Sequence, residues 1–230
     1  MNCAKAGRDK RDLTIRAPCL LLVEGQDEVA VLCALLNNRI ASPCSEHQVM
    51  GVGGRDQFRR QLGALTNQIR EARVRALGVV RDADENAADA LRSVCDALAA
   101  AGLARPDSHA EFVAAVPRVG VFVMPDGQNP GALEALCRRS IEDSPAGSCV
   151  DQYLDCLRDR GGWGNDTNPA QEDKAFAHAY LASRKNPVAR VGEGAQQGAW
   201  DFEHSAFRPL GEFLRQLVGT PSGDASSGQE

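Results

Sequence analysis

Short apolar runs alternate with amphipathic stretches as far as residue 140, and this alternation limits the folds open to the chain. The run Cys19–Val23 is suited to a strand that is buried on both faces. The following residues, 27–37, repeat their apolar side chains at helical spacing. A buried strand followed by an amphipathic helix predicts a β-α unit.

The same order recurs three more times. Strands are expected at 47–52, 76–80 and 119–124, and helices at 55–70, 86–101 and 131–140. This repetition predicts an α/β fold of the Rossmann-like kind, with a mostly parallel four-stranded sheet flanked by helices. After residue 145 the periodicity is helical alone, and helices are expected at 150–157 and 171–181.

These patterns divide the chain into four parts. We expect a basic N-terminal tail at 1–17 and the α/β core at 18–144. Residues 145–218 are expected to form a helical extension packed on the core. Residues 219–230 hold glycine, serine, proline and aspartate with almost nothing apolar, which predicts a disordered tail.

Several classes of protein are excluded. The 230 residues are 43% hydrophobic and 25% charged, as in globular domains rather than disordered chains. The most apolar stretch, 19–36, contains three acids, so no membrane partner is expected. The first seventeen residues are basic and lack the apolar segment of a secretory signal. We therefore expect a cytoplasmic protein in which most of the eight cysteines are reduced.

Acidic residues gather where a functional site is expected. In an open parallel sheet, ligands bind beyond the carboxyl ends of the strands. Carboxylates at that edge repel one another, by about 4 kcal/mol for two unit charges ~4 Å apart at an effective dielectric of ~20. A hard cation relieves this repulsion, and oxygen ligands favour magnesium, manganese or calcium over zinc. The residues predicted as metal ligands are Glu24, Glu28, Asp82, Asp84, Asp126 and Glu134.

A simpler interpretation exists for each acid taken alone. An aspartate between a strand and a helix is commonly an N-cap, and Asp82 or Asp84 could cap the helix expected to begin near Asn86. A cap acts by itself, whereas a metal site needs the whole set of acids together.

Two segments resemble the signature of a known superfamily. They are Val23-Glu24-Gly25-Gln26-Asp27-Glu28 after the first strand and Asp82-Ala83-Asp84 after the third. A glutamate with a later D-x-D pair resembles the TOPRIM domain of topoisomerases, bacterial primases and the overcoming-lysogenization-defect nucleases. The stretches 124–134 and 174–182 look similar to an uncharacterised family of small stand-alone TOPRIM-related proteins. The resemblance covers about residues 19–202 and implies a TOPRIM fold.

The resemblance also implies roles for the matching residues. Glu24 matches the TOPRIM glutamate, and Asp82 and Asp84 match its metal-binding pair. In the nuclease branch the site is completed by a further acid, a Leu-Glu pair and a lysine, whose places are taken here by Glu28, Glu134 and Lys174. The set implies one or two Mg²⁺ or Mn²⁺ ions, with Glu24, Glu134 and Lys174 as catalytic residues.

The lysine has an alternative. Lys185 lies only eleven residues after Lys174 in the sequence and could supply the same charge. We favour Lys174.

The chain departs from that nuclease branch in one respect. Other nucleases of the branch are usually fused to an ATPase, and no G-x-x-x-x-G-K-[ST] loop occurs in this sequence. A separate ATPase or another protein is therefore an expected partner, and homodimerisation is left open.

Basic residues after the second strand predict contacts to nucleic acid. Together with Lys185, the residues expected to track a phosphate backbone are Arg55, Arg59 and Arg60. A solvated helix face paired with Asp56 and Glu71 is the alternative interpretation. The net charge of −5 argues weakly against nucleic acid, because bound divalent ions would offset the acids locally.

Three hypotheses of function result. The first is a Mg²⁺- or Mn²⁺-dependent phosphoryl-transfer enzyme, a nuclease that cleaves DNA or RNA. The second is a non-catalytic TOPRIM-fold module that binds metal and a nucleic acid or nucleotide and works with a partner. The third is a receiver-like domain, which the glutamate after the first strand and the long helical segment fit poorly.

Overall fold

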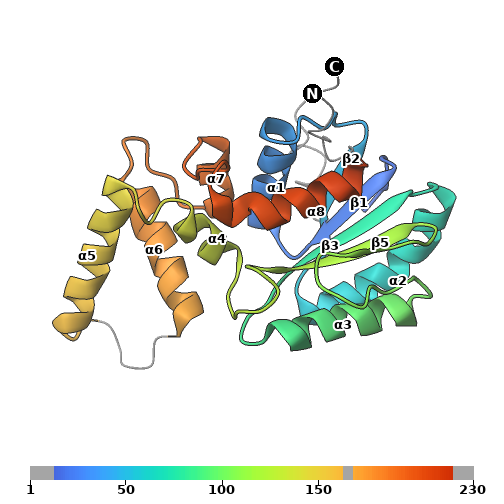
Figure 1. Ribbon diagram of the computed structural model, residues 1–230, viewed down its shortest axis with the longest axis horizontal. Helices are drawn as coiled ribbons and strands as arrows, with labels where there is room; N and C mark the ends of the chain where they lie inside the picture. The colour runs from blue at the N-terminus through green and yellow to red at the C-terminus, as the bar shows by residue number, and fades with distance from the viewer. Residues whose placement is uncertain (1–12, 163–167, 220–230) are drawn as a thin grey trace, which may run out of the picture.

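A five-stranded sheet with the strand order β2-β1-β3-β5-β4 forms the centre of the protein (Figure 1). The computed structural model describes residues 13–162 and 168–219, without the side chains of residues 55 and 56. Most of the expected basic tail and nearly all of the expected disordered tail lie outside these residues.

Four of the strands are parallel and match the strands expected from the sequence. They are β1 (Cys19–Val23), β2 (His47–Gly51), β3 (Ala76–Asp82) and β5 (Arg118–Met124). The fold class is therefore confirmed. The fifth strand, β4 (Phe112–Val113), was not predicted and pairs antiparallel with β5. Two residues are too few to show the period-two pattern by which a strand is recognised.

Helices cover both faces of the sheet. On one face lie α2 (Arg55–Glu71) and α3 (Ala87–Ala100), and on the other lie α1 (Gln26–Asn38) and α8 (Arg208–Val218) (Figure 1). The remaining helices are α4 (Leu133–Arg139), α5 (Pro145–Asp159), α6 (Pro169–Ser183) and α7 (Val191–Gln196). The sequence predicted all of them except α7 and α8.

Alternate residues of each strand enter two separate apolar cores. From β1, Leu20 and Leu22 face the helices α2 and α3, whereas Leu21 and Val23 face α1 and α8. The core on the α1 and α8 face is closely packed, because a Cβ atom at Gly78 of β3 would lie 2.8 Å from Leu21 Cδ1. Burial on both faces explains why the strands are continuous apolar runs in the sequence.

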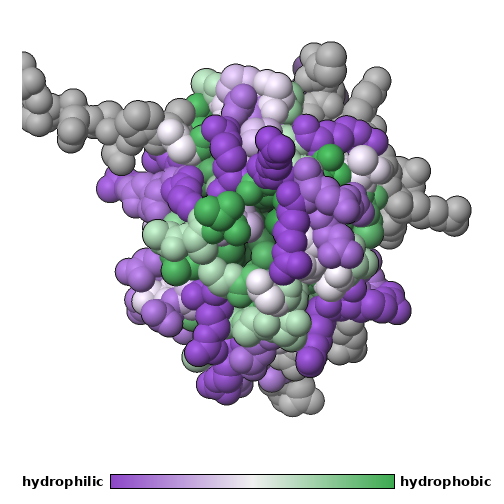
Figure 2. Space-filling model, turned by 90° about the vertical axis from the view of Figure 1, so that its right-hand side faces the viewer, coloured by the Kyte–Doolittle hydropathy of each residue, from purple (hydrophilic) through white to green (hydrophobic). Residues whose placement is uncertain are grey.

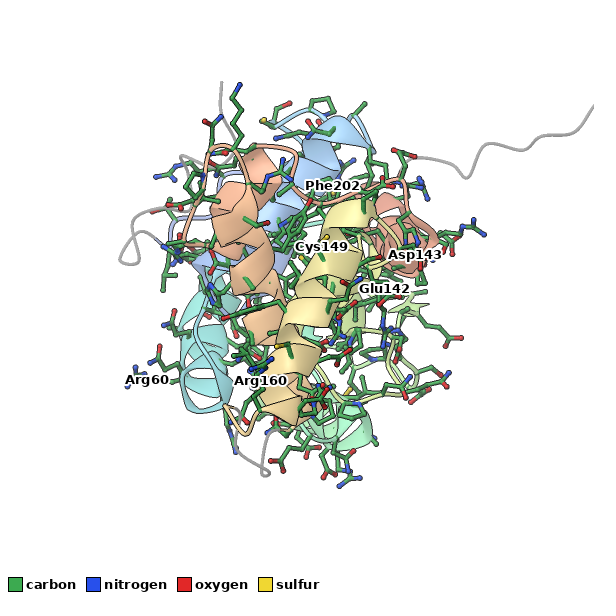
Figure 3. All side chains as sticks on the ribbon, turned by 90° about the vertical axis from the view of Figure 1, so that its left-hand side faces the viewer. Arg60, Glu142, Asp143, Cys149, Arg160 and Phe202 are labelled. Carbon is green, nitrogen blue, oxygen red and sulfur yellow. The ribbon has the colours of Figure 1, made fainter. Side chains whose placement is uncertain are left out.

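Helices α5 and α6 lie side by side at one end of the molecule (Figures 1 and 3). Arg138 of α4 joins them, because its guanidinium lies 2.9 Å from Asp151 Oδ1 of α5 and 3.1 Å from Asp173 Oδ1 of α6. Both helices begin at side-chain caps, Ser144 for α5 and Asn168 for α6. This anchoring fixes the start of α6 close to the carboxyl ends of the strands.

The opposite end of the molecule has a mixed surface, where apolar and strongly polar side chains alternate over short distances (Figure 2). Among the described residues, no helix is both long and apolar enough to cross a membrane. Six cysteines in this part of the chain are free, four of them buried, whereas Cys44 is disulfide-bonded.

Replacement of Gly147 by alanine tests the packing at the start of α5. A Cβ atom there would clash with the carbonyl oxygen of Ile141 and lie 2.9 Å from that of Glu142, and backbone atoms cannot move aside cheaply. We expect Gly147→Ala to lower the free energy of unfolding by about 1–3 kcal/mol in urea denaturation. Gly63→Ala is the control, because Gly63 lies in α2 with open space around its Cβ position. It should raise stability by about 0.5–1 kcal/mol, and equal losses for both variants would contradict this packing.

Candidate functional site

The sheet reverses its winding between β1 and β3. The chain runs from β1 to β2 on one side, and from β3 to β5 on the other. In open α/β sheets, the crevice at such a switch point is where ligands bind. Glu24 follows β1 directly, and Asp82 is the last residue of β3. Two of the predicted acids therefore stand at the position that the topology favours.

Glu24 is held by a cation from the neighbouring strand. Arg81 Nε lies 2.9 Å from Glu24 Oε1, and only 6% of the Arg81 side chain is exposed. The contact is an ion pair without hydrogen-bond geometry, so the buried Oε1 atom has no hydrogen bond from the described residues. Burial raises the pKa of Glu24, and Arg81 opposes this effect while Asp84 adds to it. Glu24 is thus a partly desolvated carboxylate.

Asp82 is the most perturbed of the acids. The backbone N–H of Leu133, at the start of α4, donates a hydrogen bond of 3.1 Å to its Oδ1 atom. Its pKa is raised well above the ordinary value, first by burial and then by the charges of Glu28, Glu24 and Glu134. These four carboxylates from β1, α1, β3 and α4 therefore act on one another.

Glu28 faces back toward the start of α1. A Cβ atom at Gly25 would lie 2.8 Å from Glu28 Oε2, which places the carboxylate beside the loop after β1. Burial raises the pKa of Glu28, and the charges of Glu24 and Glu134 raise it further. Glu28 therefore lies close enough to Glu24 and Glu134 for their charges to act on it.

The loop after β3 places Asp84 at the rim of this group. Its φ is 51°, and its backbone exchanges two hydrogen bonds with Gly131, of 3.0 and 2.9 Å. The N-cap of α3 is Asn86, whose side chain accepts a hydrogen bond from the backbone N–H of Asp89. The interpretation of Asp82 or Asp84 as the helix cap is therefore wrong.

The two candidate lysines lie in different places. Lys174 of α6 is exposed and lines a groove of about 870 Å³ together with Asp84 and Asn86, and its charge lowers the pKa of Glu24. Lys185 lines a separate pocket with Arg184 and Gln197. The structure brings Lys174 to the acids and leaves Lys185 outside the groove.

Asp126 is held in its own turn. Its carboxylate accepts hydrogen bonds from the backbone of Gln128 and from the backbone and side chain of Asn129, and it pairs with Arg139 at 3.0 Å. Burial alone would raise the pKa of Asp126, but these hydrogen bonds lower it to about 2. The carboxylate thus has a structural role, and it is not among the charges that chiefly perturb Glu24, Glu28 or Asp82.

Of the basic residues predicted to contact nucleic acid, Arg59 and Lys185 line different pockets. Arg59 lines a groove of about 640 Å³ between α2 and α3, with Arg81 and Arg92. Arg60 points outward from α2 into solvent (Figure 3). The side chain of Arg55 lies outside the described part of the structure.

The donor set suits a hard cation in its chemistry, because it consists of carboxylate oxygens. Burial raises the pKa values of Glu24, Glu28 and Asp82. Glu24 Oε1 also lacks a hydrogen bond. Within residues 13–162 and 168–219, however, no three histidine, cysteine, aspartate or glutamate side chains stand in a ready metal-binding arrangement. The carboxylates would have to turn toward an ion by rotation of their side chains.

Arg81 is the site residue that the sequence reasoning missed. It is 5% exposed in a strand whose other residues, up to Val80, are apolar. An arginine within such a run signals a buried partner, since charged side chains are seldom fully buried unless paired. The partner, Glu24, lies in the loop after the neighbouring strand β1. Its distance from Arg81 along the sequence gives no sign that the two side chains meet.

A family model and a solved structure are similar to this chain. A family model described as a protein of unknown function, DUF3226, matches residues 18–219. A solved structure of the C-terminal region of the Xanthomonas campestris pv. campestris OLD protein is similar at 16% identity and a TM-score of 0.49. That alignment covers 88% of this chain and 97% of the other. None of the curated proteins matches the chain.

Asp82→Asn should stabilise the metal-free protein at pH 7. The raised pKa means that the folded state holds the proton more tightly than the unfolded state, so stability is present at low pH and is lost as pH rises through the folded pKa. Asparagine removes the charge and retains an oxygen for the Leu133 N–H. We expect the melting temperature to rise by about 2–4 °C, the effect of roughly 1 kcal/mol in a chain of this size.

Asp126→Asn is the control of opposite sign. Its lowered pKa stabilises the fold above the unfolded pKa, and this contribution is lost as pH falls toward 2. The variant should melt at a lower temperature than the wild type at pH 7, because Arg139 loses its charged partner. Melting curves from pH 3 to 8 compare both variants with the wild type. A lower melting temperature for Asp82→Asn than for the wild type at pH 7 would contradict the unfavourable charge of Asp82.

Proposed function

The chain belongs to the DUF3226 family of proteins of unknown function, and we propose that it is a Mg²⁺- or Mn²⁺-dependent nuclease that cleaves DNA or RNA phosphodiesters. One observation carries the proposal. Glu24, Glu28, Asp82 and Glu134 come together at the switch point of the sheet. Burial raises the pKa values of the first three, and the charges of neighbouring acids in the group raise those of Glu28 and Asp82 further.

The charge balance of this group favours a cation. Like charges this close are tolerated only with bound protons or a counter-ion, and Arg81 is the one cation paired with the group within the described residues. Glu24, Glu28, Asp82 and Glu134 would hold the ion, with Asp84 at the rim. When bound, Mg²⁺ or Mn²⁺ would lower the pKa of a coordinated water and offset charge on a leaving oxygen.

The chain's own residues suit phosphoryl transfer. Glu24 is partly desolvated at the end of β1, where its carboxylate would hold the ion. Lys174 lines the same groove as Asp84, where its ammonium group would neutralise charge on a phosphate. Arg81 holds Glu24 in place through the 2.9 Å ion pair.

The sequence supports the same assignment. Glu24 and the pair Asp82 and Asp84 resemble the TOPRIM signature, in which a glutamate and two aspartates act together at a metal site. A TOPRIM fold with this site accounts for the position of each acid at the end of a strand. The same resemblance supports a nucleic acid as substrate and a separate ATPase as a protein partner.

A metal- and nucleic-acid-binding module without catalysis is the second candidate. It is favoured by the absence of a preformed three-residue metal site among the described residues, together with the ion pair that already engages Glu24. In this version a partner protein would complete the site. The two functions share the cation and differ in turnover.

Titration with Mg²⁺ and Mn²⁺, followed by calorimetry and thermal melting, tests the metal binding that both candidate functions require. The wild type should be stabilised by roughly 2.7 kcal/mol at 100 times the dissociation constant, which is about 5–10 °C. The double variant Asp82→Ala/Asp84→Ala should show neither a heat of metal binding nor a rise in melting temperature. Asp107→Ala/Asp143→Ala is the matched control, since it removes two exposed aspartates away from the group and should behave as the wild type. Metal binding by the Asp82→Ala/Asp84→Ala variant would contradict the proposed metal site.

Cleavage of labelled single- and double-stranded DNA and RNA tests the enzyme. Lys174→Ala should lower the rate by about 10²-fold and retain the metal-binding heat, because it removes transition-state charge stabilisation alone. Lys185→Ala should cleave at the wild-type rate. Metal binding without cleavage of any substrate would favour the binding module.

A further inference from the structure

A small polar pocket adjoins the acid group on the side of β2. Its volume is about 230 Å³, and it is lined by Glu24, Gln26, Gln57, Gln61 and Arg190 over the backbone of Gly51 and Gly53. It therefore draws on the loop after β1, helix α2 and the segment before α7. Nothing in the proposed cleavage uses these glutamines.

The glycines of the segment 51–54 make room for the pocket. A Cβ atom at Gly51 would lie 3.2 Å from Gln26 Nε2, and one at Gly53 would lie 2.8 Å from Gln57 Cβ. Gly53 also has a φ of 82°, which favours glycine. The two amide side chains thus lie directly against the backbone, where any larger residue would displace them.

One buried acceptor in the pocket has no partner. Gln61 Oε1 is buried and receives no hydrogen bond from the described residues. A buried polar atom without a hydrogen bond costs about 1–3 kcal/mol. Glu24 lines the same pocket, but its Oε1 atom already lies 2.9 Å from Arg81 Nε. The lining therefore favours a ligand that brings an N–H donor to Gln61.

The lining carries one charge of each sign, which favours a neutral ligand over an ionic one. Glu24 disfavours a phosphate, and Arg190, whose Nε lies 3.2 Å from Asp27 Oδ1, disfavours a cation. Three neutral amides provide both donors and acceptors. A neutral, planar group with donors and acceptors along its edge fits this chemistry, and the volume holds such a ring without its sugar and phosphate.

We propose that this pocket binds a nucleobase carrying an exocyclic amino group, whose phosphate then reaches the acid group beside it. The inference rests on the proposed function, since it names the part of the nucleic acid that the site recognises. A turn of the Gln61 side chain would bring its buried Oε1 atom to the amino group as the acceptor, and the amides of Gln26 and Gln57 bind the ring edge, as glutamine binds adenine elsewhere. Enzymes that act on nucleic acid commonly read an unstacked base in a pocket of this kind.

Fluorescence anisotropy with short single strands tests the proposal. Three strands differ only at the central position, which is adenine, purine (adenine without its amino group) or an abasic site, and Ca²⁺ replaces Mg²⁺ to prevent cleavage. The wild type should bind the adenine strand about tenfold more tightly than either other strand. Gln61→Leu should bind all three within twofold of one another.

Gln68→Leu is the matched control, because Gln68 lies two turns farther along α2 and does not line the pocket. It should keep the tenfold preference. Gln57→Ala provides a second test if Gln61→Leu melts early, since Gln57 is exposed and its loss should also reduce the preference.

Equal binding of adenine and abasic strands by the wild type would overturn the base pocket and leave the proposed nuclease standing. Failure of the wild type to bind any strand would overturn both. Retention of the preference by Gln61→Leu and Gln57→Ala would place base recognition elsewhere and so reject the pocket.

Discussion

Repulsion among half-buried carboxylates is the constraint on which the site depends. Asp82 ends a strand whose residues lie in the core, so sheet pairing fixes its backbone close to Glu24, Glu28 and Glu134. Such an arrangement is unfavourable in itself, and a fold keeps it at a cost to stability. Burial first, and the charges of the neighbouring acids second, raise the pKa values of Glu28 and Asp82.

Two structural features hold the acids together against this repulsion. The N–H of Leu133 binds Asp82, which ties the start of α4, and with it Glu134, to the end of β3. Arg81 pairs with Glu24 from the adjoining strand. Helix α6 then brings Lys174 to the open side of the group, because Arg138 anchors α6 to α4. The helices after β5 thus complete a site that the sheet begins.

Much of this could be predicted from the sequence. The strands β1, β2, β3 and β5 are recognisable because burial on both faces gives short apolar runs, and the parallel topology then places Glu24 and Asp82 at one edge. Asp126 follows a strand in the same way, yet Asn129 and Arg139 hold its carboxylate. These partners depend on how the turn folds, which the spacing of acids does not reveal.

Other features depended on contacts between distant segments. Arg81 pairs with Glu24, which follows a different strand. The pocket beside Glu24 is lined by residues of α2 and by Arg190 near α7, a helix that the periodicity did not indicate. The strand β4 and helix α7 are also too short to give a clear pattern. Local periodicity therefore predicted the sheet and its acidic edge, whereas the partners of each acid required the fold.

Anomalous diffraction from crystals of the wild type grown with Mn²⁺ is the most direct measurement of the metal site. We predict a manganese peak within coordination distance of carboxylate oxygens from Glu24 and Asp82, with Glu28 or Glu134 turned toward it. A peak at Asp126, or none at the switch point at saturating Mn²⁺, would contradict the site and, with it, the proposed nuclease.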